Sequence, residues 1–134
     1  MSTTSSIALS GLNAAALRLQ VSASNVANVS SDGPLPGSAN GAGSPAAYAA
    51  LRVDQTATAG GGTSATVQAV SPSTVPKFEP TASFADSNGL VASPNVDLTN
   101  EIVQQALARY VFTASAAVVR TDTEMAAKLF NITA

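Results

Sequence analysis

The fold of this chain is decided by its C-terminal stretch, residues 90–134, which reads LVASPNVDLTNEIVQQALARYVFTASAAVVRTDTEMAAKLFNITA. Apolar residues recur there at steps of three and four, the spacing that places side chains on one face of an α-helix. The first apolar row consists of Val103, Leu107, Val111, Ala114, Val118, Thr121, Met125, Leu129 and Ile132. A second apolar row lies beside it and consists of Leu98, Ile102, Ala106, Phe112, Ala116 and Val119. Two rows on one helix indicate neighbours on more than one side. A helix from about Asp97 to Asn131 would be roughly 50 Å long.

The N-terminal region predicts a second helix, from about Thr4 to Val29, with Ser5 or Ser6 as its N-cap. Its apolar positions follow a heptad pattern: Leu9, Leu12, Ala16, Leu19, Ala23 and Val26. The helix should end near Ser30, because glycines and prolines follow in SSDGPLPG. The simplest way to bury the apolar rows of both helices is to pair them antiparallel as a coiled coil.

The region between the helices predicts a loop at residues 31–44 and then a small β element. Residues 47–55 and 63–70 alternate in polarity on either side of a glycine turn, which is typical of a hairpin. An isolated hairpin is marginal in water, so this one should lean on a helix or a partner.

Prolines at 72, 76 and 80 favour an extended connection from the hairpin to the C-terminal helix. The expected fold is therefore mainly α with a small β insertion. Residues 1–31 and 90–134 would form the helical core, and residues 32–89 the loop, the β element and the Pro-rich connection.

The composition favours a surface that other subunits cover. Charged residues make up 10% of the chain and aromatic residues 4%, whereas charged residues are about 25% of a typical domain. Such a surface suits contact with other proteins, although a merely Ala/Ser-rich composition is an alternative explanation. The net charge is −2 without a basic run, which gives no support for nucleic-acid binding.

The residue types present exclude several common kinds of catalytic site. The chain has no His and no Cys, which excludes a Ser-His-Asp triad, a Cys-His dyad and ordinary zinc sites. Asp97 and Glu101 are better explained as acidic residues at the positive end of a helix. We expect no enzymatic activity, no metal and no cofactor. The N-terminus lacks the basic start of a signal peptide, and no run reaches ~18 continuous apolar residues.

Two polar features have more than one interpretation. Asn25 and Asn28, near the end of the first helix, either cap it or form lateral hydrogen bonds between packed helices. Residues 94–97 either form only a turn and helix start, or also dock the C-terminal helix on a neighbouring subunit.

The stretch SGLNAAALRLQVSASNVANVSS (residues 10–31) fits the pattern A-L-x-L-x-x-x-A-x-N-[IV]-A-N. With this pattern the chain resembles bacterial flagellar axial proteins, which include rod, hook and hook-associated subunits. The matching positions are Ala16, Leu17, Leu19, Ala23, Asn25, Val26, Ala27 and Asn28. The stretch NGLVASPNVDLTNEIVQQALARY (residues 88–110) is similar to the segment around PNVDL in rod proteins of the proximal-rod C type.

The resemblance implies a structural subunit that assembles helically into the periplasmic rod, with its terminal helices around the export channel. It also implies export through the flagellar type III apparatus without a cleaved signal peptide. The implied partners are copies of the chain itself, other proximal-rod proteins, membrane-ring subunits and distal-rod subunits. The candidate assembly residues are Leu9, Leu12, Leu19, Asn25, Val26, Asn28, Pro94, Asn95, Val96, Asp97, Leu98, Val103, Leu107, Tyr110, Val111, Val118, Met125 and Leu129. The alternatives are another rod or rod-like axial subunit, or a self-contained exported binding module built on a helical hairpin.

Overall fold

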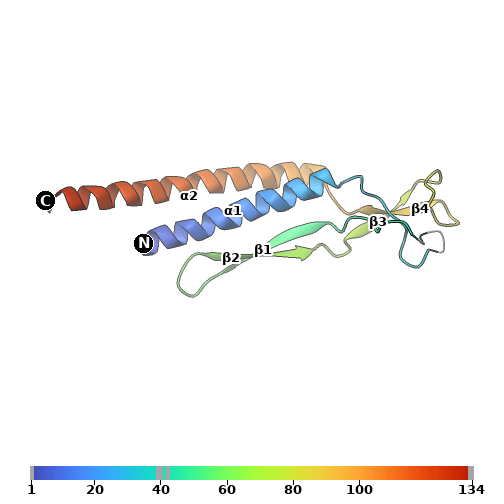
Figure 1. Cartoon of the computed structure of the whole chain (residues 1–134), viewed down its shortest axis with the longest axis horizontal. Helices are drawn as coiled ribbons and strands as arrows, with labels where there is room; N and C mark the ends of the chain where they lie inside the picture. Colours follow the sequence, from blue (N-terminus) through green and yellow to red (C-terminus); the bar gives the residue numbers. More distant parts are fainter. Residues whose placement is uncertain (1, 39–40, 42, 133–134) are drawn as a thin grey trace.

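Two long antiparallel helices and two small sheets make up the computed structural model, which describes residues 2–38, 41 and 43–132 (Figure 1). The elements in chain order are α1 (Thr3–Ala27), β1 (Leu51–Ala57), β2 (Thr63–Ala69), β3 (Thr74–Phe78), β4 (Leu90–Pro94) and α2 (Leu98–Ile132). α1 packs against α2 on one side and against the β1–β2 hairpin on another. The expected fold class, mainly α with a small β insertion between paired terminal helices, is confirmed.

α1 starts earlier than the sequence predicts. Its N-cap is Ser2, whose hydroxyl accepts a hydrogen bond from the Ser5 N–H at 3.0 Å. The prediction of Ser5 or Ser6 as the cap was wrong, because every residue of the run STTSS carries a hydroxyl and the pattern alone does not choose among them. Ser5 has another role, since its hydroxyl donates to the carboxylate of Asp122.

The Ser2 hydroxyl also donates to Asp122, at 2.5 Å. This contact places the start of α1 level with Asp122 of α2. Because α2 continues to Ile132, residues 123–132 extend beyond the first residue of α1 (Figure 1).

The helices meet through small side chains rather than through the leucines that the sequence suggested. The buried residues Ala8, Ala15 and Ser22 of α1 are spaced seven apart, and Ala108 of α2 is buried as well. A Cβ atom added at Gly11 would lie 3.0 Å from the Ser115 Oγ atom, so the two backbones are close there. Small residues permit this short interhelical distance. The expectation that pairing buries the apolar rows of both helices was wrong: among the α1 residues of the predicted heptad pattern, Leu9 and Leu19 are exposed.

The predicted hairpin is present as β1 and β2, which pair antiparallel from Leu51↔Ala69 to Ala57↔Thr63. A second sheet was not predicted: β3 pairs antiparallel with β4, from Thr74↔Pro94 to Phe78↔Leu90. Pro76 is tolerated because β3 is an edge strand. On the other side of β4, the Gly33 N–H donates to the Ala92 carbonyl at 2.9 Å and the Ala92 N–H donates to the Gly33 carbonyl at 2.8 Å.

Some predicted ranges extend past the described residues. Residues 39, 40 and 42 of the expected loop lie outside the description, as do residue 1 of the first predicted helical region and residues 133–134 of the second.

α2 is long and apolar enough to cross a membrane by length and composition, with a mean hydropathy of 1.3 over its most apolar window. Only 6% of that window is buried inside the chain. The helix also carries Arg109, Arg120 and Lys128, charges that are costly in hydrocarbon. The exposed apolar surface is therefore better matched by protein neighbours.

Candidate assembly surface

α2 turns its apolar side chains outward and its polar and small ones toward α1. Among the described residues, Ala108 is the only buried residue of this helix. Most of the exposed large apolar side chains of the described chain belong to α2, and Ile102 is 66% exposed. A surface helix of a monomeric protein has the opposite arrangement, with its apolar side against the core.

Polar contacts hold α2 in this orientation at both ends of the helix pair. Near the start of α2, the Ser22 hydroxyl donates to the Glu101 carbonyl at 3.1 Å. Near the start of α1, the hydroxyl of Ser2 and then that of Ser5 hold the pKa of Asp122 below its usual range, because both donate to its carboxylate. These contacts fix the rotation of α2 about its axis, and that rotation exposes the two apolar rows except for the half-buried Ala116 and Val119.

A groove lies on one side of the helix pair, and we name it the Leu19 groove. It has a volume of about 440 Å³ and is lined by Ala15, Ala16, Leu19, Gln20, Ala23, Ala108, Arg109, Phe112 and Thr113. A further apolar hollow of about 550 Å³ lies where α1 begins, with Leu9, Val119, Met125 and Leu129 among its lining residues. Residues of the second apolar row and of the α1 heptad pattern thus share these surfaces.

A different groove, the Val118 groove, is lined by α1, α2 and the tip of the hairpin. It has a volume of about 490 Å³, and its lining includes Ile7, Gly62, Ala114 and Val118. The Leu19 and Val118 grooves share no lining residue. The helix pair therefore offers two separate apolar surfaces.

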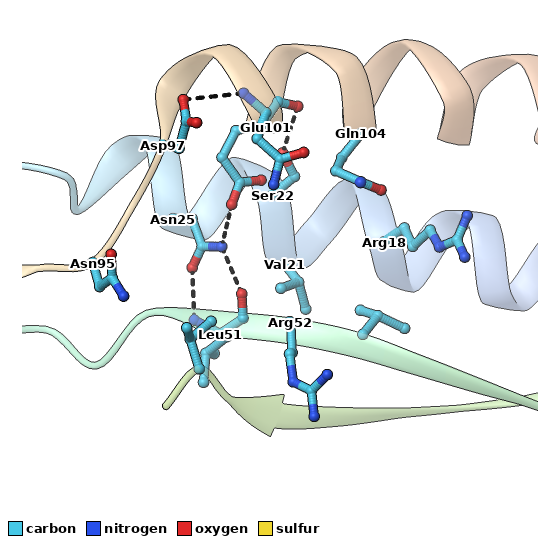
Figure 2. Close-up of a pocket in the computed structure, with 13 residues that line it drawn as sticks. Arg18, Val21, Ser22, Asn25, Leu51, Arg52, Asn95, Asp97, Glu101 and Gln104 are labelled. Atoms are coloured by element: carbon cyan, nitrogen blue, oxygen red, sulfur yellow. Dashed lines mark hydrogen bonds between the residues drawn. The ribbon is translucent and has the colours of Figure 1, made fainter. Parts of the chain in front are cut away.

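Asn25 joins three elements inside the chain (Figure 2). Its side chain is 2% exposed. The Nδ2 group donates to the Leu51 carbonyl at 2.7 Å and to the Glu101 Oε1 atom at 2.6 Å. The Oδ1 atom accepts from the Leu51 N–H at 3.0 Å and from the Tyr48 hydroxyl at 3.1 Å. An amide side chain offers two donor hydrogens and two acceptor lone pairs, so all its capacity is used.

The two asparagines thus have different roles. Asn25 forms hydrogen bonds from α1 to a neighbouring helix, as one of the two interpretations expected, and that helix is α2 of the same chain. Asn28 caps α1, since its backbone N–H donates to the Ser24 carbonyl and its Nδ2 group donates to the same oxygen at 2.9 Å. No sequence pattern indicated Tyr48, Leu51 or Ser22 as hydrogen-bond partners, because each is an ordinary residue within its own segment.

The PNVDL segment connects β4 to α2. Pro94 ends β4 and is buried. The Asn95 Nδ2 group donates to the Pro72 carbonyl at 2.9 Å. The Asp97 Oδ1 atom accepts from the Thr99 N–H at 2.9 Å, so Asp97 caps α2. Asp97 and Glu101 do lie at the start of the helix, and Glu101 has an additional partner in Asn25.

The candidate assembly residues differ widely in accessibility. The buried ones are Asn25 and Pro94, and the half-buried ones are Leu12, Val26, Asn28, Asn95 and Val96. The exposed ones are Leu9, Leu19, Asp97, Leu98, Val103, Leu107, Tyr110, Val111, Val118, Met125 and Leu129. Only the exposed and half-buried residues can meet another molecule without a change in the fold. Within the described residues, no group of three or more acidic side chains is placed to hold a metal ion.

The family described as flagella basal body rod protein matches residues 6–34. This range covers nearly all of α1, its C-cap and the first residues of the following loop. No curated protein matches the chain. The matched family is structural rather than enzymatic, and the match supports a structural role in the flagellar basal-body rod.

Proposed function

We propose that this chain is a subunit of the proximal part of the flagellar rod, the periplasmic drive shaft of the motor. The match of residues 6–34 to basal body rod proteins supports the class of function. The observation that carries the proposal is the outward orientation of the apolar rows of α2. Copies of the chain would pack their helices side by side around the export channel, with the β1–β2 hairpin on the outside.

The mechanism is resistance to shear. Each helix pair has two separate apolar grooves, so neighbouring subunits would pack against it on more than one side. Burial of ~1,000 Å² of apolar surface per subunit contributes about 25 kcal/mol before the cost of association. Sliding one subunit along another would return this surface to water in every copy at once, which gives the shaft torsional stiffness.

The proposed partners follow from this position. They are further copies of the chain, other proximal-rod proteins, membrane-ring subunits and distal-rod subunits. The chain would reach the periplasm through the flagellar type III export apparatus without a cleaved signal peptide.

The alternative of a self-contained binding module predicts that the apolar rows are buried within one chain. The exposed rows of α2 disfavour that alternative. Another position along the rod, rather than the proximal one, would use the same exposed rows.

The test is one acidic substitution in each groove, Leu19→Asp and Val118→Asp. Both side chains are exposed in the single chain. The free energy of unfolding of the purified protein, measured in urea, should therefore change by only ~0.5 kcal/mol. Incorporation into basal bodies and motility should be lost, because a carboxylate would be buried without a partner at the subunit contact. The matched control is Thr81→Asp at an exposed loop position, which should remain motile. Motile cells with both groove variants would show that the packing scheme is wrong.

A further inference from the structure

The β1–β2 hairpin has two edges with unpaired main-chain groups. In an antiparallel pair, residues alternate between those whose N–H and C=O groups point to the partner strand and those whose groups point away. The Val70 N–H donates to the Ala50 carbonyl at 2.8 Å, so this pair faces inward. The N–H and C=O groups of Leu51 face outward, where both are bonded to Asn25. Odd-numbered residues of both strands therefore point away from the hairpin.

On β1, Asn25 occupies the first outward position and leaves the rest of the edge open. The outward main-chain groups of Val53, Gln55 and Ala57 have no hydrogen-bond partner in the described part of the chain. On β2, the Thr63 N–H donates to the Ser10 hydroxyl at 3.1 Å. The outward groups of the remaining odd-numbered residues, 65, 67 and 69, likewise have no partner among the described residues.

β2 also lacks the features that normally protect a free edge. Natural proteins use charged side chains, prolines or a covering segment for this purpose. β2 reads TSATVQA, without a charge or a proline. In contrast, β3 contains Pro76 and Lys77, and the edge of β4 is covered by Gly33.

A polar cleft of about 420 Å³ lies beside the open edge of β1 (Figure 2). Leu51 and Val53 line it from β1, Arg18 from α1, and Asn100 and Gln104 from α2. A strand that pairs with β1 would run about 4.8 Å from it. Such a strand would enter this cleft, where polar side chains of both helices are available to it.

We propose that β1 of one copy pairs with β2 of the next copy, so that the hairpins form a continuous antiparallel sheet along the assembly. The proposal rests on the proposed assembly and adds a specific contact to it. Both strands have seven residues, and both present outward groups at odd-numbered positions. The incoming β2 would run antiparallel to β1, as the β2 of the same hairpin does on the opposite edge. The contact joins two different edges, so it repeats from copy to copy rather than closing a two-fold dimer.

Disulfide formation tests this pairing cleanly because the chain has no cysteine. Cells would produce two variants of different size together, Gln55→Cys on β1 and Val67→Cys on β2. Opposite residues of paired antiparallel strands have Cα atoms about 4.5–5.5 Å apart, which lies within the range of about 4.4–6.8 Å that a disulfide spans. Ala65→Cys and Ala69→Cys replace Val67→Cys in parallel cultures, to cover a register shift of two residues.

The expected result is an oxidised dimer in isolated basal bodies that contains one β1 variant and one β2 variant. Either variant alone should give no dimer, and neither should Gln55→Cys with the control Phe78→Cys on β3. Dimers from a β2 variant alone would overturn the proposal, because they indicate two-fold pairing of like edges. Basal bodies that contain the chain but no mixed dimer would overturn the pairing and leave the rod function intact. Basal bodies without the chain would overturn both.

Two proline variants distinguish the hydrogen bonds that the outer edge of β2 would form with another copy from those between β2 and β1 within the hairpin. Ala65→Pro removes an N–H that points outward, whereas Thr66→Pro removes one that bonds to β1. Ala65→Pro should leave the purified chain folded and abolish the mixed disulfide between Gln55→Cys and Val67→Cys. Thr66→Pro should disrupt the hairpin itself. A folded Ala65→Pro chain that still forms the mixed disulfide at the unsubstituted level would overturn the proposed hydrogen bonding.

Discussion

The two helices of this chain have opposite environments. α1 contacts α2 and the hairpin, and its buried residues are mostly alanine and small polar residues. α2 contacts α1 through a narrow strip and exposes most of its large apolar side chains. In a monomeric protein, the helix with more large apolar residues would be expected in the centre.

The difference separates two tasks. α1 organises the single chain, since its hydrogen bonds reach the hairpin through Asn25 and reach α2 at both ends of the helix pair through Ser22 and Ser5. In the proposed rod, α2 supplies the surface for other molecules. Substitutions at the buried residues of α1 should therefore reduce the stability of the isolated chain, whereas substitutions at exposed apolar residues, mostly on the outer side of α2, should act on assembly.

The largest effect on the isolated chain is expected from Asn25→Ala. The change leaves the Leu51 main-chain groups, the Tyr48 hydroxyl and the Glu101 carboxylate without their partner. Loss of satisfied hydrogen bonds at a buried site should lower the free energy of unfolding by about 3–5 kcal/mol. Urea unfolding of the purified chain measures this loss. Asn28→Ala is the matched control and should cost about 1 kcal/mol, because it removes a single capping side chain. Equal losses in the two variants would show that the hydrogen bonds of Asn25 stabilise the fold no more than a single capping side chain does.

A smaller effect is expected from Ala108→Leu, which enlarges the side chain at the narrow contact between the helices. Ala108 is 1% exposed, so the added atoms must push the helices apart, at a cost of about 1–3 kcal/mol. Ala106→Leu on the same helix is exposed and should change the free energy of unfolding by less than ~0.5 kcal/mol. The same urea measurement compares the two variants. If both leave the stability unchanged, the contact is looser than the small residues indicate.

The smallest effect is expected from Asp122→Asn, and it should depend on pH. The hydroxyls of Ser2 and Ser5 lower the pKa of Asp122 in the folded chain, which means that folding favours the carboxylate. The resulting stability is present above the unfolded pKa of about 3.9 and is lost as the pH falls through the lower folded value. The variant should therefore be less stable than the wild type at pH 7, and the difference should shrink below about pH 4. A difference that stays constant from pH 7 into the acid range would assign the effect to packing rather than charge.

The sequence predicted the elements better than it predicted their orientation. Both helices are found within a few residues of their expected ends, because steps of three and four and the glycines and prolines after residue 32 are strong local signals. The second sheet was missed because Pro76 and Pro94 are unusual in strands, and their tolerance depends on position in the sheet.

The direction of each apolar row was not predictable from periodicity. A repeat shows which residues share a face but does not tell which face meets the partner helix. Ala8, Ala15 and Ser22 have little apolar surface, so the contact they form gave a weaker signal than Leu9 and Leu19. Asn25 could be singled out as unusual in a helix, but its partners come from strand and helix segments far away in the sequence. Contacts of that kind depend on the tertiary fold.

The unequal length of the helices has a consequence for any fibre built from this chain. α2 has 35 residues and α1 has 25, and the extra turns of α2 lie past the first residue of α1. A pair of equal helices could be inverted with little change in outline, whereas this pair has one tapered end and one blunt end. Copies stacked in a single direction would therefore give a shaft whose two tips are chemically different, and a newcomer would meet a different docking surface at each tip.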